Sequence, residues 1–169
     1  VTTLGILKAI LRRGKTYPNP EALKKAEIVV AAQSRAFRIA RSAGINMAMG
    51  TDASVSIRNG DNALELIELT AEGLSPFDAL LMATRNAAVA LGLQDEIGTV
   101  EPGKAADLIL LDENPLDDIS VIAGKRAIRA VMRGGRILCA RNENGEEILG
   151  TPLPLETATQ AIRGRRKPL

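Results

Sequence analysis

The stretch MGTDASVSIRNGDNALELIEL, residues 49–69, decides the fold class of this chain. It completes a run of small and mostly apolar residues, 45–52, and then passes into a segment whose apolar residues recur at helical spacing. A short, nearly continuous apolar run is typical of a parallel strand that is covered on both faces. The stretch therefore predicts a buried strand that ends in Gly50-Thr51-Asp52, then a loop, then a helix.

Three helices are predicted next to this strand, over residues 21–43, 62–72 and 75–92. Each starts at a polar cap or a proline and ends at a glycine, the residue that most readily adopts the left-handed conformation at a helix end. Asp61 or Asn62 is the expected cap of the second helix. A helix, a strand and two more helices in this order predict an α/β layered domain, residues 1–94.

Beyond Gln94 the helical spacing is replaced by short β segments. Gly134-Gly135 is a two-residue hairpin signal, and Pro102-Gly103 suits a type II turn. We expect a small antiparallel sheet in a second domain, residues 95–141, and a weakly ordered tail, residues 142–169. The predicted strands are 97–100, 106–111, 127–133 and 136–139.

The composition excludes several classes of partner. The 22 basic and 20 acidic residues are mostly interspersed, so nothing argues for nucleic acid, and the basic run 163–167 is expected to be a solvated end. No apolar run is long enough to span a bilayer. The single cysteine, Cys139, agrees with a reducing cytoplasm and is expected to be a buried small residue.

The chain has no histidine, which removes most catalytic options. Ser54 and Ser56 have no histidine to activate them, and neither a glycine-rich phosphate loop nor a cysteine pair is present. In parallel α/β folds, chemistry collects at the carboxyl ends of the strands, and Asp52 lies at such an end. Asp52 either caps the following turn or acts as a metal ligand or general base. The spacing of the residues alone leaves both interpretations open.

Seven segments together resemble the C-terminal portion of the amidohydrolase superfamily, most closely the branch with imidazolonepropionase-like and Xaa-Pro dipeptidase-like enzymes. The resemblance covers roughly residues 1–140 in unbroken order, and its most specific parts contain GTDA and IGTVEPGKAADL. The segments are MGTDA (49–53), RNGDNALEL (58–66), GLSP (73–76), ATRNAA (83–88), LGL (91–93), IGTVEPGKAADL (97–108) and VMRGGR (131–136).

This resemblance implies the C-terminal part of a TIM-like (β/α)8 barrel, followed by strands of a small β-sandwich domain that both chain termini build. Residues 1–3 would end the seventh barrel strand, and residues 45–51 would form the eighth. Residues 95–140 would supply the C-terminal share of the sandwich.

The resemblance also implies the chemistry. The family's eighth-strand aspartate binds a divalent metal, expected here to be zinc, and takes a proton from the water that attacks a C–N bond. Asp52 would have this role. Many relatives carry a histidine where this chain has Asn59, so Asn59 is the expected substrate contact. The implied function is hydrolysis of an amide, a cyclic amide or a dipeptide-like small molecule.

Family metal sites also use histidines from the first, fifth and sixth strands, and this chain contains none of those strands. One aspartate cannot hold a catalytic zinc. We therefore expect the chain alone to be inactive and to be a fragment of a longer enzyme. The alternative is a non-catalytic truncated paralogue that serves as a binding or scaffold module. No nucleic-acid or membrane partner is expected, and a homo-oligomer is left open for the full-length form.

Overall fold

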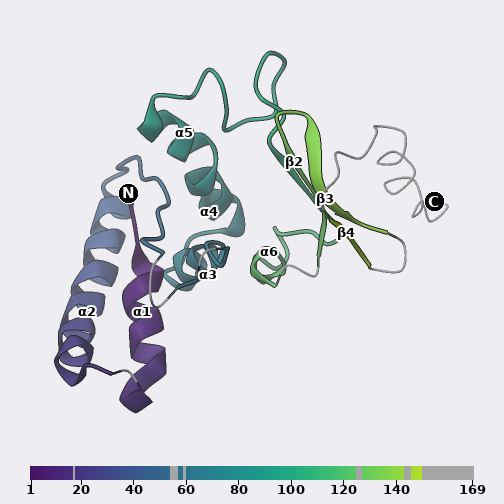
Figure 1. Ribbon diagram of the computed structural model, residues 1–169. Helices are drawn as coiled ribbons and strands as arrows, with labels where there is room; N and C mark the ends of the chain where they lie inside the picture. Colours follow the sequence, from purple (N-terminus) through teal and green to yellow (C-terminus); the bar gives the residue numbers. More distant parts are fainter. Residues whose placement is uncertain (17, 54–56, 59, 125–126, 143–145, 150–169) are drawn as a thin grey trace.

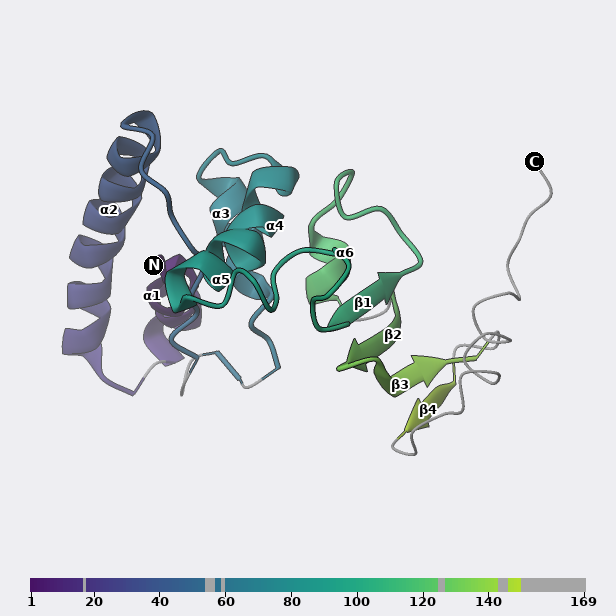
Figure 2. The ribbon, with the colours of Figure 1, turned by 90° about the horizontal axis from the view of Figure 1, so that it is seen from above.

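The computed structural model describes residues 1–16, 18–53, 57–58, 60–124, 127–142 and 146–149. Within these ranges a group of helices precedes a small antiparallel sheet (Figure 1). Figure 2 shows the sheet at one end of the molecule and α2 at the other, with α3, α4 and α5 between them. The helical elements are α1 (Leu4–Arg13), η1 (Gly14–Thr16), α2 (Pro20–Ser42), α3 (Leu64–Ala71), α4 (Pro76–Ala83), α5 (Arg85–Leu91) and α6 (Ser120–Ala123).

The long helix α2 begins and ends where the sequence predicts. Asn19 Oδ1 accepts the backbone N–H groups of Glu21 and Ala22 at 3.0 and 3.1 Å, and Pro20 occupies the first helical position. After the helix, Gly44 adopts a φ of 67°, the left-handed conformation expected of a glycine stop. The preceding helix, α1, was not expected from the sequence and packs against α2.

No regular strand forms at residues 45–52, contrary to the prediction. One parallel bridge joins this segment to the start of the chain, between Thr2 and Met49. Thr2 N–H donates to Ala48 O at 2.9 Å, and Gly50 N–H donates to Thr2 O at 2.8 Å. On the other side, Met49 N–H donates to Met82 O in α4 at 2.9 Å. The parallel direction agrees with the prediction, but a regular strand needs a longer ladder than this single pair provides.

The N-cap predicted for the helix over residues 62–72, which is α3, is wrong. α3 has Ala63 as its N-cap residue, so neither Asp61 nor Asn62 occupies that position. Instead, the backbone carbonyl groups of Asp61 and Asn62 accept the N–H groups of Leu64 and Glu65 at 3.0 and 3.1 Å. A backbone turn therefore comes before the helix and moves its start beyond the two polar residues.

The helix predicted over residues 75–92 is two helices, α4 and α5. Thr84 separates them with φ −120° and ψ −90°, and its Oγ1 donates to Leu80 O at 2.7 Å. A threonine hydroxyl that binds the backbone of the preceding turn competes with regular helix geometry. The predicted start and end are confirmed, because Ser75 Oγ accepts Asp78 N–H at 3.1 Å and Gly92 adopts a φ of 72°.

Residues 97–100 form no strand, which corrects a second β prediction. Gly98 has a φ of 98°, and a Cβ atom placed on it would lie 2.6 Å from Ala88 Cβ. The backbone of this segment therefore packs directly on α5, and that close approach replaces pairing with a strand.

The small antiparallel sheet is confirmed, with strand order β1-β2-β3-β4. Gly134 and Gly135 form the predicted hairpin turn with φ values of 54° and 76°, as a type I′ turn requires. One strand, β4, lies inside the segment 142–169 that was expected to be weakly ordered. Residues 150–169, with the basic run, lie outside the described residues. The strands are β1 (Leu108–Leu111), β2 (Ile128–Arg133), β3 (Arg136–Arg141) and β4 (Glu147–Leu149).

Two apolar clusters hold these elements together. Ile119, just before α6, belongs to the larger cluster, so the β region packs on the helices through α6. The larger cluster consists of Leu4, Phe37, Leu66, Leu69, Ala79, Met82 and Ile119, and the smaller one, in the sheet, of Ala130, Ile137 and Ala140.

None of the helices in the described ranges is long and apolar enough to cross a bilayer.

Candidate functional site

Asp52 follows the bridge between Thr2 and Met49, where the two parallel segments end. Its side chain is exposed, and its φ of 48° is the one positive value at a non-glycine residue in the described part of the chain. Left-handed non-glycine residues are uncommon and cluster at functional sites. The Asp52 carboxylate makes no hydrogen bond or ion pair with another described residue. An exposed carboxylate with no described partner suits one ligand of a metal ion, and the N–H groups that a turn cap would use, those of residues 54–56, lie outside the described residues.

Gly50 allows the chain to pass close to its own start. A Cβ atom at this position would lie 2.6 Å from Val1 Cγ1 and 3.1 Å from Thr2 O. Only glycine tolerates an approach this close while its N–H donates to Thr2 O. The Gly-Thr-Asp motif thus has a physical basis, because the glycine permits the parallel contact and the aspartate follows at its exposed end.

A buried carboxylate that was not expected from the sequence lies beside this segment. The Glu65 side chain is 0% exposed, and its Oε1 and Oε2 accept the N–H groups of Leu4 and Gly5 at 2.7 and 2.6 Å. These N–H groups belong to the first turn of α1, where Thr3 provides no side-chain cap. Because the first amides of a helix have no partner within it, the Glu65 carboxylate replaces the missing cap from 60 residues away.

Burial raises the pKa of Glu65 above its usual value of 4.5. The N–H donors of Leu4 and Gly5 oppose this shift because they stabilise the charged form, but they do not cancel it. The negative charge of Glu68 raises the pKa further, and the positive charge of Lys8 lowers it. The carboxylate is therefore held in place by strong donors in an environment that disfavours its charge.

Glu65 and Glu68 lie on one face of α3, Glu72 follows as its C-cap residue, and all three side chains are buried or nearly so. Their spacing of three and four residues was the signal in the sequence, since acids at this spacing lie on the same side of a helix. Together they connect α3 to α1 and α2. Their ionic and hydroxyl contacts are Glu68 with Lys8 (3.2 Å) and Arg12, and Glu72 with Lys8 (2.9 Å), Ser34 (2.6 Å) and Arg38 (2.7 Å).

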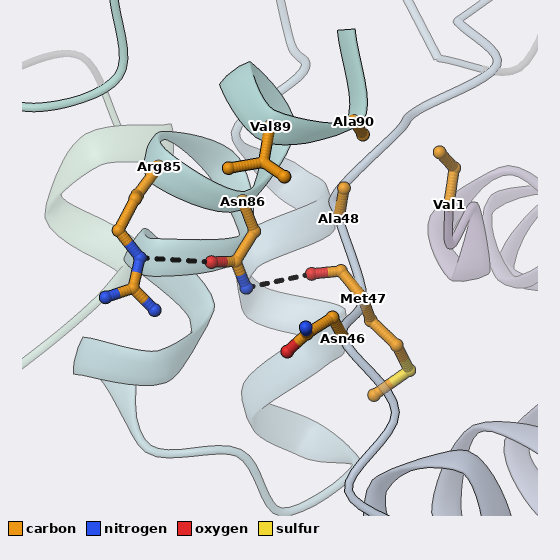
Figure 3. Close-up of a pocket in the computed structure, with 8 residues that line it drawn as sticks. All are labelled: Val1, Asn46, Met47, Ala48, Arg85, Asn86, Val89 and Ala90. Carbon is orange, nitrogen blue, oxygen red and sulfur yellow. Dashed lines mark hydrogen bonds between the residues drawn. The ribbon is translucent and has the colours of Figure 1, made fainter. Parts of the chain in front are cut away.

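A pocket of about 270 Å³ opens beside the residues that precede Met49 (Figure 3). Asn86 Nδ2 donates to Met47 O at 3.0 Å, and Arg85 Nε donates to Asn86 Oδ1 at 3.4 Å. Asp52 does not line this pocket, so the pocket and the carboxylate belong to different parts of the segment. The lining residues are Val1, Asn46, Met47, Ala48, Arg85, Asn86, Val89 and Ala90.

The remaining polar residues and the cysteine either lie outside the described part of the chain or have structural contacts. Asn59, the expected substrate contact, lies outside the described residues, as do Ser54 and Ser56. Cys139 is a free thiol in β3 and is half-buried rather than fully buried. Lys104 Nζ lies 2.6 Å from Thr99 Oγ1 and 3.2 Å from a Glu101 carboxylate oxygen, so its contacts stabilise this turn.

The described residues do not by themselves form a metal site. No group of three or more His, Cys, Asp or Glu side chains in the described ranges could hold an ion. Asp52 has suitable chemistry for one ligand, because its carboxylate is exposed and engages no other described side chain. A catalytic zinc needs about three protein ligands. The remaining ligands would have to come from outside the described residues.

Comparison with known proteins identifies the family. A model of the amidohydrolase family matches residues 2–138, which include Asp52 and Glu65. The chain belongs to the amidohydrolase family. The resemblance predicted from the seven segments is thereby confirmed.

Individual amidohydrolases cover most of this chain. Ochratoxinase from Aspergillus niger is 32% identical over 139 residues, 81% of this chain and 28% of that protein. Imidazolonepropionase from Maricaulis maris is 43% identical over 105 residues, 58% of this chain and 24% of that protein. The crystal structure of a Xaa-Pro dipeptidase with bound methionine in the active site matches with a TM-score of 0.68 and 30% identity, over 81% of this chain and 33% of that one. This chain thus spans less than a third of the length of these two curated relatives.

Proposed function

We propose that this chain forms the C-terminal part of a metal-dependent amidohydrolase that hydrolyses a C–N bond in a small molecule. Family membership supports the reaction class, since the relatives include proteins named as a deaminase, an imidazolonepropionase and a dipeptidase. The substrate class is an amide, a cyclic amide or a dipeptide-like compound. The observation that carries the proposal is the exposed carboxylate of Asp52, which has no partner among the described residues and lies on a left-handed backbone at the end of the parallel contact.

Asp52 is the residue of this chain to which we assign the chemistry. A divalent metal, taken here as zinc, supplies when bound a water molecule whose pKa is lowered towards about 7. The Asp52 carboxylate would provide one ligand to that metal. One of its oxygens, Oδ1 or Oδ2, would take a proton from the water as its oxygen bonds to the carbonyl carbon, and would deliver that proton to the nitrogen as the C–N bond breaks. The exposed position of the carboxylate suits both tasks, since it leaves both oxygens open to a ligand.

The proposal also concerns the zinc ligands that the described residues do not supply. One carboxylate does not complete a zinc site, so we propose that the chain alone does not turn over substrate. Asn59 is proposed as a substrate contact on the resemblance alone. A non-catalytic binding module remains the competing function, and it differs in a measurable way, because a protein with no complete ligand set retains no stoichiometric metal.

The test uses the complete polypeptide that contains this chain, purified with zinc and assayed against dipeptides, N-acyl amino acids and cyclic amides. We expect Asp52→Asn to abolish turnover and to reduce the zinc content while the fold, measured by circular dichroism, is retained. Asp117→Asn is the matched control, because Asp117 is also an exposed aspartate. Retained turnover in Asp52→Asn would overturn the assignment of Asp52. A wild-type protein with neither turnover nor bound metal would favour the binding module.

A further inference from the structure

Full burial of Glu65 goes beyond what capping of a helix requires. An exposed Ser, Thr or Asp at the N-cap would satisfy the same amides at little cost in desolvation. Glu65 is instead 0% exposed, and a buried carboxylate is costly unless its hydrogen bonds hold it in one geometry. The two N–H donors at 2.7 and 2.6 Å provide that geometry. Glu65 therefore holds the backbone of Leu4 and Gly5 at one position relative to α3.

The same short segment, residues 2–5, anchors the loop that contains Asp52. Two residues before Asp52, Gly50 N–H donates to Thr2 O at 2.8 Å. Further along the loop, Ile57 is 2% exposed and lies against Gly5, where an added Cβ atom would be 3.4 Å from Ile57 Cδ1. The same Cβ atom would be 2.9 Å from Glu65 Oε2. The loop thus contacts the anchor segment on both sides of Asp52.

We infer that Glu65 is a positioning residue for Asp52, acting through the anchor segment 2–5. The Glu65 carboxylate fixes the positions of Leu4 and Gly5. These residues fix the positions of Thr2 and Ile57, and Thr2 holds Gly50, two residues before Asp52. The inference rests on the proposed function for its catalytic consequence. Its structural part, the control of the loop by Glu65, stands without it.

Glu65→Gln in the complete polypeptide is the decisive variant. Glutamine keeps the shape, but one carboxylate oxygen becomes an NH2 group that faces a backbone N–H donor, so one of the two hydrogen bonds is lost. Glu65→Asp keeps the charge with a shorter reach and serves as the second variant. Glu72→Gln is the matched control, because Glu72 is the C-cap residue of α3 and accepts hydrogen bonds from Lys8, Ser34 and Arg38 but from no residue of the anchor segment.

Two measurements decide the outcome. Because a misplacement of about 1 Å costs up to about 100-fold in rate, we expect Glu65→Gln to lower kcat by about tenfold or more while KM stays within about twofold. Amide hydrogen exchange should show faster exchange at Thr2 and Gly50 in Glu65→Gln, and unchanged exchange there in Glu72→Gln. Glu72→Gln should keep kcat within about twofold of the wild-type value, even if it lowers the melting temperature as much as Glu65→Gln does.

The failures of the two proposals can be told apart. If Glu65→Gln leaves exchange at Gly50 unchanged, or if Glu72→Gln lowers kcat as much as Glu65→Gln does, the positioning role is overturned. If the wild-type protein hydrolyses none of the substrates, the proposed function fails. The exchange data on Glu65→Gln and Glu65→Asp still decide whether Glu65 positions the loop.

Discussion

Asn86 Nδ2 donates a hydrogen bond to Met47 O at 3.0 Å, across 39 residues of sequence. The bond connects α5 to the segment that leads to Asp52, at a place where no strand partner is present in the described residues (Figure 3). It is one of the contacts that hold this segment in place without a regular ladder. The ATRNAA motif therefore has a structural role as well as value as a family signature.

Asn86→Ala should lower the free energy of unfolding by about 1–2 kcal/mol, because the Met47 carbonyl loses its partner. Asn86→Asp should cost at least as much, since a carboxylate cannot donate to a carbonyl oxygen. Urea unfolding of each variant measures the loss. Gln94→Ala is the control, because Gln94 makes one long side-chain contact of 3.4 Å with its neighbour Asp95. Equal stability of Asn86→Ala and Gln94→Ala would contradict the prediction.

Gly98→Ala should destabilise the protein by more than about 2 kcal/mol, because it combines an unfavourable φ with overpacking. The new Cβ atom would meet Ala88 Cβ at 2.6 Å, at a φ of 98°. Gly103→Ala is a matched control in the same motif, because Gly103 has a φ of 91° and nothing within 4 Å of the added Cβ atom. The difference between the two variants in chemical denaturation reports the clash alone. Ala88→Gly should recover part of the loss in Gly98→Ala, and no recovery would count against this explanation.

Glu72 should contribute stability that is lost in acid. Burial by itself would raise the pKa of Glu72, but the hydrogen bonds from Ser34 and Lys8 and the charges of Lys8 and Arg38 outweigh it and hold the pKa below the usual 4.5. A lowered folded-state pKa means that this contribution is complete above 4.5 and disappears as the pH falls through the folded value. Glu72→Gln should therefore lose less stability than wild type on acidification from about pH 5 to about pH 3.

Glu65 serves as the internal contrast in this experiment. Its pKa is raised, so its contribution to stability is complete below 4.5 and is lost as the pH rises through its folded value. The pH dependence of Glu65→Gln should therefore differ from wild type in the direction opposite to that of Glu72→Gln. If the pH dependence of stability changed in the same direction in both variants, these pKa assignments would be refuted.

Asp112→Asn should destabilise the sheet by about 2 kcal/mol or more, because it leaves a buried arginine without its counter-charge. Arg129 is 8% exposed, and its Nε and one terminal nitrogen both lie 2.9 Å from Asp112 Oδ1. The double variant Asp112→Asn with Arg129→Met should recover much of the loss, because it removes the unpaired charge as well. Thermal unfolding of the single and double variants tests the pair. Additive losses would show that the two side chains are not coupled.

Several elements could be predicted from the sequence because short-range chemistry specifies them. Asn19 and Pro20 define the start of α2 through capping, and Gly134-Gly135 defines the hairpin through its positive φ values. Other predictions failed where a short-range signal met a competing contact. Thr84 divides one predicted helix into two, and Gly98 packs on α5 where a strand was expected.

The candidate site also contains features that the sequence predicted and features that it did not. Asp52 could be selected from the sequence, because it follows an apolar segment and belongs to a family motif. Its left-handed conformation could not be predicted, since it follows a place where Gly50 passes close to Thr2, far away in the sequence. Glu65 looked like an ordinary residue of an amphipathic helix, and its importance became visible only when α1 was placed beside it.

By itself, the sequence determined the family, the place of Asp52, the main helix α2 and the hairpin of the sheet. These features depend on motifs, caps and turns within a few residues of one another. The tertiary structure alone decided that residues 45–52 make one parallel bridge, that Glu65 caps α1, and that Glu72 is bonded to both α1 and α2. The physical reason is that each of these contacts joins atoms from distant parts of the chain. Hydrogen bonding and desolvation at such contacts depend on where folding brings the partners, which no local pattern records.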